Sequence, residues 1–208
     1  MSDRQKPQAL ILAGGASRRM GRDKATAPFA GRPMIAWIVE RLAPQVISLA
    51  INAPEGFPLD LGLPLVPDTI ADRQGPLAGV LAGLRHAAAT SSASHMLTVP
   101  ADTPFLPPNL AATLCAAADD PARILLAASA GRVHPVVALW PLSLADDLEI
   151  WLADPGNRRL QAYIARHPSL AVDFPLIETS AGPLDPFFNV NTPADLLSAE
   201  RYLEALSK

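Results

Sequence analysis

The chain has 208 residues, of which 50% are hydrophobic and 18% are charged, a balance typical of a globular domain and not of a disordered chain. Its formal net charge of −3 gives no electrostatic basis for binding nucleic acid. It has one cysteine, Cys115, which excludes an intramolecular disulfide framework and a zinc site built from several cysteines.

The first eight residues are polar and lack the apolar core of a secretory signal. No stretch reaches the roughly 18 apolar residues of a membrane span, so we expect a cytoplasmic protein.

Residues 9–13 are continuously apolar, which predicts a buried parallel strand. This strand ends at Gly14 and Gly15, and paired glycines permit positive φ angles and a close approach of a ligand to the backbone.

A loop rich in hydrogen-bond donors and positive charge follows the two glycines. It contains Ser17, Arg18, Arg19, Gly21, Arg22 and Lys24. Backbone N–H groups in such a loop form a concavity for anions, and arginine and lysine supply the counter-charge. The pattern predicts a polyphosphate site, although it lacks the spacing of a P-loop and of a Rossmann G-x-G-x-x-G fingerprint. A glycine turn followed by a solvated basic loop is the structural alternative.

The remainder of the chain alternates between helical and strand patterns. We predict helices over residues 33–43, 75–86, 110–118, 142–152, 158–165 and 193–206. We predict strands over residues 46–51, 65–67, 95–99 and 170–174, an irregular connection over 53–64, and a hairpin formed by 123–128 and 133–140. This alternation predicts an α/β fold with a largely parallel sheet and a hairpin insertion.

Polar residues mark the ends of several predicted strands. They are Gly14, Asn52, Asp68 and Asp102. Because ligands bind beyond the carboxyl ends of strands in an open parallel sheet, these residues predict a binding site there. Asp102 is the candidate ligand for Mg²⁺, which takes one or two carboxylates and completes its shell with phosphate oxygens and water. An aspartate before Thr-Pro is also a common turn residue or helix cap.

Residues 12–24 (Leu-Ala-Gly-Gly-Ala-Ser-Arg-Arg-Met-Gly-Arg-Asp-Lys) resemble the signature of the molybdenum cofactor guanylyltransferases, a family of nucleotidyltransferases. The resemblance continues in residues 68–79, 102–104, 134–135 and 189–193. It implies a three-layer α/β/α, Rossmann-like nucleotidyltransferase fold in a single domain over residues 1–208. Within that domain, residues of about 8–105 would bind the nucleotide and those of about 106–208 would bind molybdopterin.

The resemblance also implies the reaction. The terminal phosphate of molybdopterin would attack the α-phosphate of Mg·GTP in line, releasing pyrophosphate and forming the guanine dinucleotide form of the cofactor. We expect no covalent enzyme intermediate. Because the attacking phosphate is already ionised near neutral pH, alignment and charge stabilisation suffice without a dedicated general base.

Family positions then imply roles for individual residues. The catalytic residues would be Arg19, Lys24 and Asp102, with Arg19 and Lys24 neutralising the charge of the triphosphate. The nucleotide-binding residues would be Leu12, Ala13, Gly14, Gly15, Lys24, Asn52, Asp68, Gly75, Gly79 and Asp102. Either a carboxylate or an amide can read the donors and the acceptor of guanine, so the sequence leaves open whether Asp68 or Asn52 contacts the base.

The molybdopterin-binding residues would be Asn189, Asn191, Arg158 and His134. A period of two places both asparagines on one face of an extended segment. The structural alternatives are that Asn191 or Thr192 caps the last helix and that His134 is a satisfied core or rim residue.

Three other functions remain open at this stage. The chain resembles CTP-dependent molybdopterin cytidylyltransferases and sugar-phosphate nucleotidyltransferases less closely, and a non-catalytic GTP- or cofactor-binding protein is a further alternative. We expect GTP and molybdopterin as substrates, Mg²⁺ as cofactor, and transient contacts with proteins that insert or accept the cofactor. We expect no nucleic-acid or membrane partner, and a monomer, because no long exposed apolar stripe is evident.

Overall fold

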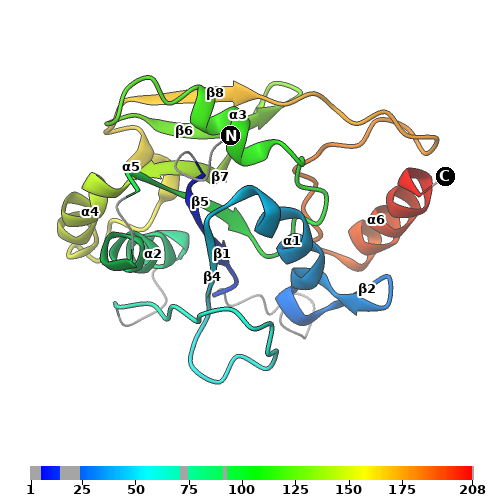
Figure 1. Ribbon diagram of the computed structural model, residues 1–208, viewed down its shortest axis with the longest axis horizontal. Helices are drawn as coiled ribbons and strands as arrows, with labels where there is room; N and C mark the ends of the chain where they lie inside the picture. The colour runs from blue at the N-terminus through cyan, green and yellow to red at the C-terminus, as the bar shows by residue number, and fades with distance from the viewer. Residues whose placement is uncertain (1–5, 15–23, 71–74, 91–92, 208) are drawn as a thin grey trace.

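A computed structural model of the chain describes residues 6–14, 24–70, 75–90 and 93–207 (Figure 1). Six strands in this part of the chain form one mixed sheet. In spatial order they are β4 (Ser48–Asn52), β1 (Gln8–Leu12), β5 (His95–Pro100), β7 (Arg132–Pro141), β6 (Ile124–Ser129) and β8 (Ser169–Asp173). Strand β7 is antiparallel to both of its neighbours, whereas the other pairs are parallel, so five strands share one direction.

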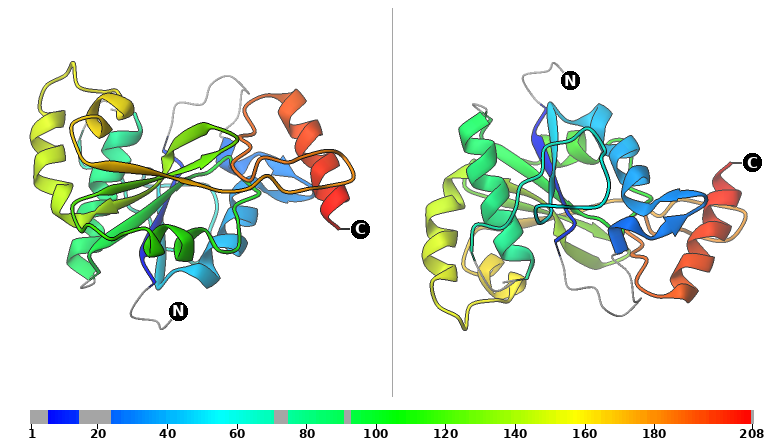
Figure 2. Two further views of the ribbon diagram at one scale, coloured as in Figure 1. Left: turned by 90° about the horizontal axis from the view of Figure 1, so that it is seen from above. Right: turned by 90° about the horizontal axis from the view of Figure 1, so that it is seen from below.

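Helices cover both faces of this sheet (Figures 1 and 2). Alternate residues of each strand point to opposite faces. Ile11 of β1 therefore packs with α1 (Met34–Leu42) and α3 (Leu110–Ala116) on one face. Leu10 packs with α2 (Pro76–Thr90), α4 (Ala145–Leu152) and α5 (Leu160–Ile164) on the other. The predicted three-layer α/β/α architecture is confirmed.

A third, smaller cluster lies beside the end of β5. Phe105 packs there with Phe29 and Tyr202 in edge-to-face contacts, with ring centroids 6.1 and 6.4 Å apart. Phe29 belongs to the two-residue strand β2 (Pro28–Phe29), and Tyr202 belongs to the last helix, α6 (Pro193–Leu206). These contacts hold the C-terminal helix against the rim of the sheet (Figure 1).

Short elements complete the described chain. They are the 3₁₀ turns η3 (Lys24–Thr26), η4 (Ala43–Gln45) and η5 (Leu142–Leu144), and the strand β3 (Arg32–Pro33) that pairs with β2. No helix of the described residues is long and apolar enough to cross a membrane.

Several predicted boundaries differ from the structure by a few residues; α2, for example, ends at Thr90 and not at residue 86. Two of the differences have a local cause. The helix predicted from Pro33 begins at Met34, because Pro33 pairs with Pro28 across a turn in which Ala30 and Gly31 have positive φ angles. The strand predicted over residues 65–67 is reduced to one parallel bridge between Ile51 and Leu65. Prolines at positions 64 and 67 flank it, and a proline has no N–H to extend a ladder.

Candidate active site

The carboxyl ends of β4, β1 and β5 lie side by side in the half of the sheet where β4 is the edge strand (Figure 1). In the sheet register Leu12 lies opposite Asn52 on one side and Pro100 on the other. The pairing continues beyond the strands, because the Ala13 amide donates to the Asn52 carbonyl at 3.0 Å and the Ala101 amide donates to the Leu12 carbonyl at 3.2 Å. The predicted convergence of polar strand ends is therefore present in the structure for these three strands.

Asn52 is buried, with 2% of its surface exposed, and both N–H groups of its side-chain amide are engaged. The Nδ2 group donates to the Val66 carbonyl at 3.0 Å and to Asp68 Oδ1 at 2.8 Å. Two hydrogen bonds use both N–H groups of the amide. Asp68 itself is exposed, and the bond from Asn52 fixes one of its two carboxylate oxygens.

Glycines allow α2 to approach the Asn52 side chain closely. A Cβ atom at Gly79 would lie 2.3 Å from Asn52 Oδ1 and 2.8 Å from Leu12 Cδ2, and one at Gly14 would lie 3.1 Å from Asn52 Oδ1. Contacts below 3.0 Å force a neighbour to move, so Gly79 is required for the observed position of the Asn52 amide. Small residues on this face of α2 thus allow the helix to lie close to the strand ends.

Asp102 follows β5 and is half-buried at the same edge. Its carbonyl accepts a hydrogen bond from the Val190 amide at 2.9 Å, and the buried Thr103 hydroxyl donates to Asn189 Oδ1 at 2.9 Å. These bonds bring the asparagine motif of the C-terminal part beside the candidate metal ligand. Asn189 and Asn191 are exposed while Val190 is buried, as the period of two predicts.

The 185–191 segment carries this motif and is fixed at its beginning by a buried polar cluster. Ser129, at the end of β6, donates its hydroxyl to Asp185 Oδ1 at 2.7 Å and lies 2.7 Å from His134 Nε2. His134 is buried against the Phe187 ring, with centroids 4.8 Å apart. Burial lowers the pKa of His134, Asp185 raises it to a lesser extent, and Arg132 lowers it further.

The end of the same segment is fixed by the cap of α6. The Thr192 hydroxyl accepts a hydrogen bond from the Asp195 amide at 3.1 Å, while Asp195 Oδ2 accepts from the Asn191 and Thr192 amides at 2.9 and 2.8 Å. This reciprocal pattern is a capping box. Thr192 is therefore the helix cap, and the Asn191 side chain remains exposed beside it.

The other predicted residues lie elsewhere or outside the described chain. Arg158 precedes α5, and its carbonyl would lie 3.9 Å from a Cβ at Gly75, near the start of α2. Arg158 precedes α5 whereas the two asparagines precede α6, and these two helices lie towards opposite ends of the long axis (Figures 1 and 2). Gly15 and Arg19 lie outside the described residues, and Lys24 begins η3, where only its backbone is described.

The donor set at Asp102 fits a magnesium ion that is shared with a phosphate ligand. Within residues 6–14, 24–70, 75–90 and 93–207 there is no group of three or more His, Cys, Asp or Glu side chains that could hold a metal by themselves. A hard cation with one protein carboxylate must take its other ligands from phosphate and water, as Mg²⁺ does in nucleotide sites.

Comparison with known proteins identifies the family. The family model of the MobA-like NTP transferase domain matches residues 9–179. A molybdenum cofactor guanylyltransferase of Rhizobium meliloti (strain 1021) is 54% identical over 203 residues, covering 96% of this chain and 93% of that protein. One of Sinorhizobium fredii (strain NBRC 101917 / NGR234) is 51% identical over 208 residues, covering 99% and 95%. The chain belongs to the molybdenum cofactor guanylyltransferase family. It is accordingly a nucleotidyltransferase, as the resemblance implied.

Solved structures support the fold of this guanylyltransferase family chain. Molybdopterin-guanine dinucleotide biosynthesis protein A from Archaeoglobus fulgidus superposes with a TM-score of 0.69 at 23% identity, covering 95% of this chain and 98% of that one. The 2-C-methyl-D-erythritol 4-phosphate cytidylyltransferase from Thermus thermophilus superposes with a TM-score of 0.65 at 22% identity, covering 96% and 99%. The nucleotidyltransferase fold predicted from the sequence is thus confirmed.

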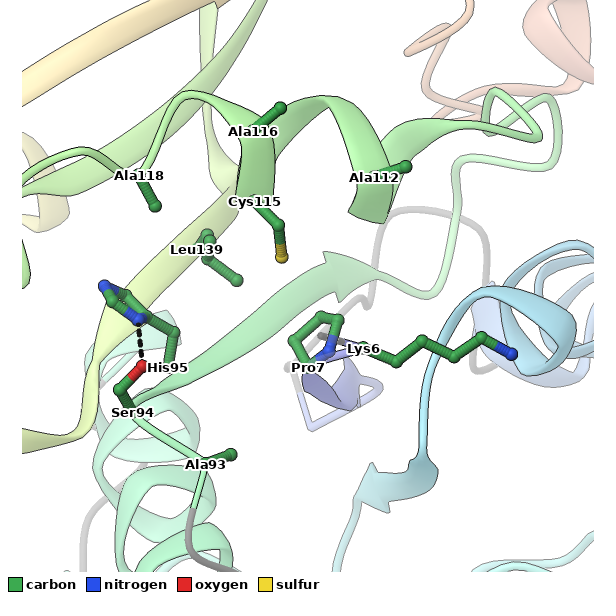
Figure 3. A pocket seen from close by; sticks show the side chains of 10 residues that line it. All are labelled: Lys6, Pro7, Ala93, Ser94, His95, Ala112, Cys115, Ala116, Ala118 and Leu139. Atoms are coloured by element: carbon green, nitrogen blue, oxygen red, sulfur yellow. Dashed lines mark hydrogen bonds between the residues drawn. The ribbon is translucent and has the colours of Figure 1, made fainter. Parts of the chain in front are cut away.

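A cavity of about 390 Å³ lies at the opposite, amino end of the strands and holds none of the residues predicted for guanylyl transfer (Figure 3). Lys6, His95 and Cys115 line it together with small apolar side chains. Burial raises the pKa of the Cys115 thiol and lowers the pKa of His95. A protonated thiol is a poor nucleophile, and the cavity lies at the opposite end of the strands from Asn52 and Asp102, so it is separate from the candidate active site.

Sequence reasoning missed two residues of the site, Ser129 and Asp185. Ser129 reads as the start of a hairpin turn, and Asp185 lies in a stretch with no recognised motif. Their hydrogen bond spans 56 residues of the chain, so no local pattern could connect them.

Proposed function

We propose that this chain transfers GMP from GTP to the terminal phosphate of molybdopterin, releasing pyrophosphate and forming the guanine dinucleotide form of the cofactor. The names of relatives at 54% and 51% identity support this activity. The observation that carries it is the attachment of Asn189 and Val190 to the Asp102–Thr103 pair by two hydrogen bonds of 2.9 Å. These two bonds place the exposed Asn189 side chain beside the carboxyl end of β5, in the half of the chain that we expect to bind the nucleotide.

On the nucleotide side we propose that Asp68 reads the guanine and Asn52 positions Asp68. Both N–H groups of Asn52 already donate to Val66 and Asp68, and its side chain is buried. The exposed Asp68 carboxylate keeps a second oxygen, and a carboxylate accepts hydrogen bonds only. Guanine presents two neighbouring N–H donors on its N1 and exocyclic nitrogen atoms, which match such an acceptor.

The phosphates of GTP would bind along the first strand end and the basic loop. Leu12, Ala13, Gly14 and Gly15 would offer backbone groups there, while Gly75 and Gly79 would line the nucleoside pocket. A glycine at these positions lets the chain approach a ligand without a Cβ atom in the way. Lys24 and Arg19 would neutralise the triphosphate charge, which grows on the leaving pyrophosphate during the transfer.

Asp102 would hold Mg²⁺ through its carboxylate, with the phosphate oxygens of GTP and water as the remaining ligands. When bound, the ion would neutralise phosphate charge and polarise the α-phosphorus towards attack. The chain's own contribution is to fix Asp102. The bond of its carbonyl to the Val190 amide and the bond of Thr103 to Asn189 fix the Asp102–Thr103 backbone from which the carboxylate projects.

On the acceptor side we propose that Asn189 and Asn191 bind molybdopterin, with His134 nearby in the same half of the chain. Their amide groups would hydrogen-bond the polar edge of the pterin and align its terminal phosphate with the α-phosphate of GTP. Holding two reactants in line supplies much of the acceleration in such a transfer.

Five further expectations stay predictions. They are a contact of Arg158 with the pterin phosphate, the division of the domain near residue 105, the cytoplasmic location, the monomeric state, and transient contacts with proteins that deliver or receive the cofactor.

The test is nucleotide selectivity of the purified chain. With Mg²⁺ and molybdopterin, we expect GTP to give the dinucleotide and an equal amount of pyrophosphate, and CTP to give neither. Omitting molybdopterin is the control for plain GTP hydrolysis. Turnover with CTP would assign the chain a cytidylyltransferase activity instead. Tight GTP binding without turnover would favour a binding protein or a different acceptor.

A further inference from the structure

Three polar side chains outside the family motifs of the nucleotide half form one buried cluster at the carboxyl end of β6. Ser129 is fully buried, His134 is 9% exposed, and the Asp185 side chain is 28% exposed. The Ser129 hydroxyl lies 2.7 Å from both His134 Nε2 and Asp185 Oδ1. Buried polar groups are costly unless they are paired, so such a cluster persists only when every member is satisfied.

Counting protons defines the direction of each hydrogen bond. A serine hydroxyl has one hydrogen, and Ser129 donates it to Asp185 Oδ1. The contact between Ser129 and His134 therefore requires His134 to donate from Nε2 to the serine oxygen. Because burial lowers the pKa of His134, the ring is neutral near pH 7 and carries its one proton on Nε2. The chain of donation thus runs from His134 to Ser129 to Asp185.

This arrangement is not a hydrolytic triad. In a triad the carboxylate binds the histidine and the serine hydroxyl is accessible to a substrate. Here Asp185 binds the serine, its other oxygen is 3.8 Å from His134 Nε2, and Ser129 has no exposed surface. The cluster therefore does not act on a substrate through Ser129.

What the cluster holds is the start of the 185–191 segment. Asp185 Oδ1 also accepts the Phe187 amide at 2.8 Å, and the Asp185 carbonyl accepts the Phe188 amide at 3.0 Å. The Phe187 ring lies between His134 and Phe174, with centroid distances of 4.8 and 5.3 Å. The backbone that follows reaches Asn189 and then bonds to Asp102 through Val190. The orientation of Asn189 thus depends on contacts made at the end of β6.

We propose that Ser129, His134 and Asp185 are positioning residues for the acceptor substrate, which hold the 185–191 segment so that Asn189 and Asn191 face the same ligand as Asp102. This inference rests on the proposed function, since the ligand in question is molybdopterin. It assigns to His134 a role through Ser129 and the segment, whereas direct contact with the pterin is the alternative.

The experiment compares four variants with wild type in guanylyl-transfer kinetics and in equilibrium binding of molybdopterin. Ser129→Ala removes both bonds of the hydroxyl and should raise the KM and the Kd for molybdopterin about tenfold, with the KM for GTP within about twofold of wild type. His134→Gln can keep a donor where Nε2 lies and should stay near wild type. His134→Asn is too short to reach Ser129 and should behave like Ser129→Ala.

Ser94→Ala is the matched control. Ser94 Oγ lies 2.8 Å from His95 Nδ1 at the amino end of β5, so the substitution removes a serine–histidine hydrogen bond far from the 185–191 segment. It should leave all kinetic constants unchanged. Thermal unfolding of each variant separates a loss of folding from a loss of positioning, and the two His134 variants decide the matter if Ser129→Ala is poorly folded.

Equal effects of the Gln and Asn substitutions at position 134 would overturn the inference, and so would a rise in the KM for GTP as large as that for molybdopterin. Because binding is measured directly, the two proposals fail separately. A wild-type chain that binds molybdopterin and responds to these variants but transfers no GMP would refute only the proposed function. A chain that does not bind molybdopterin would refute both.

Discussion

The two sides of the candidate active site are built in different ways. On the nucleotide side, Asn52 reaches Asp68 across only 16 residues, and the sheet register and the glycines of α2 set its position. On the acceptor side, Thr103 reaches Asn189 across 86 residues and Ser129 reaches Asp185 across 56. The first side is part of the packed sheet, whereas the second depends on a few side-chain hydrogen bonds of about 1 kcal/mol each.

This difference teaches where each side is sensitive. A change on the nucleotide side disturbs close packing, so it affects folding and binding together. A change on the acceptor side removes hydrogen bonds that hold one irregular segment, so it affects mainly the binding of the second substrate. The predictions below address this contrast, beginning with the residue that both sides share.

The largest effect is expected at Asp102, where the two sides meet. Asp102→Ala should lower kcat by about a thousandfold or more while the chain stays folded, because it removes the proposed metal carboxylate. The measurement is pyrophosphate release at saturating GTP and molybdopterin. Asp173→Ala is the matched control, since Asp173 is an exposed aspartate that ends β8, and it should have no effect. Full activity of Asp102→Ala that still requires Mg²⁺ would remove the metal assignment.

A smaller effect is expected for a methyl group added to α2. Gly79→Ala places a Cβ 2.3 Å from Asn52 Oδ1, so the amide must move and Asp68 loses its anchor. We expect the KM for GTP to rise about tenfold, with a cost in stability of about 1–3 kcal/mol from overpacking. Both are measured on one preparation, by kinetics and by urea unfolding.

Gly83→Ala is the control on the same face of the helix. Its Cβ would meet Leu10 and Met96 at 2.5 and 2.8 Å, both of them side chains of the hydrophobic core, whereas the Cβ at Gly79 would meet Asn52. It should cost a similar amount of stability with no change in the KM for GTP. A parallel rise in that KM for both variants would mean that general loosening of the packing, and not the Asn52–Asp68 pair, controls GTP binding.

At the far end of the 185–191 segment a helix cap provides a milder perturbation. Thr192→Ala removes the hydroxyl of the capping box and should destabilise the fold by about 1 kcal/mol. Because the cap also holds the Asn191 amide through Asp195, the KM for molybdopterin should rise by about two- to threefold, while the KM for GTP stays constant. Thr192→Ser keeps the hydroxyl and should restore both values.

The smallest effect concerns pH. Because burial lowers the pKa of His134, the unfolded chain binds more protons than the folded chain between that lowered pKa and the ordinary value of about 6.5. Stability should therefore be full above this window and fall as the pH is lowered through it. His95, whose pKa burial also lowers, adds to the same trend.

Urea unfolding at about pH 7.5 and about pH 5.5 measures this loss, and His134→Gln should reduce it because glutamine does not titrate in this range. The same substitution at His95 serves as a comparison at the amino end of β5. An identical pH dependence in wild type and His134→Gln would show that His134 is not the group that titrates.

The contrast between the two sides also explains what the sequence could predict. Hydrophobic periodicity predicts the strands, most helices and the layer order, because buried elements this regular leave a clear pattern. The ends of β1, β4 and β5 follow from the same pattern. The two-residue strands β2 and β3 are too short to show a period, and the bridge at Leu65 depends on flanking prolines.

On the acceptor side, only the family motifs indicate binding residues in the sequence. The motif at residues 189–193 and Asp102 lie far apart in the sequence, and no local pattern indicates that Thr103 bonds to Asn189. Ser129 and Asp185 carry no motif, so their role depends on the folded structure. Arg158 shows the reverse case, because its backbone carbonyl lies near Gly75 at the start of α2, whereas the two asparagines precede α6.

The most direct test of this two-sided site exchanges one atom on each side. Asp68→Asn keeps an oxygen for the Asn52 amide but replaces the other carboxylate oxygen with a donor, and Asn189→Asp keeps an oxygen for Thr103 but adds a negative charge. Equilibrium binding of GTP and of molybdopterin is measured for both variants. We predict that Asp68→Asn weakens GTP binding alone and that Asn189→Asp weakens molybdopterin binding alone. If either variant weakened both ligands equally, or mainly the opposite ligand, the division of the site between its two sides would be wrong.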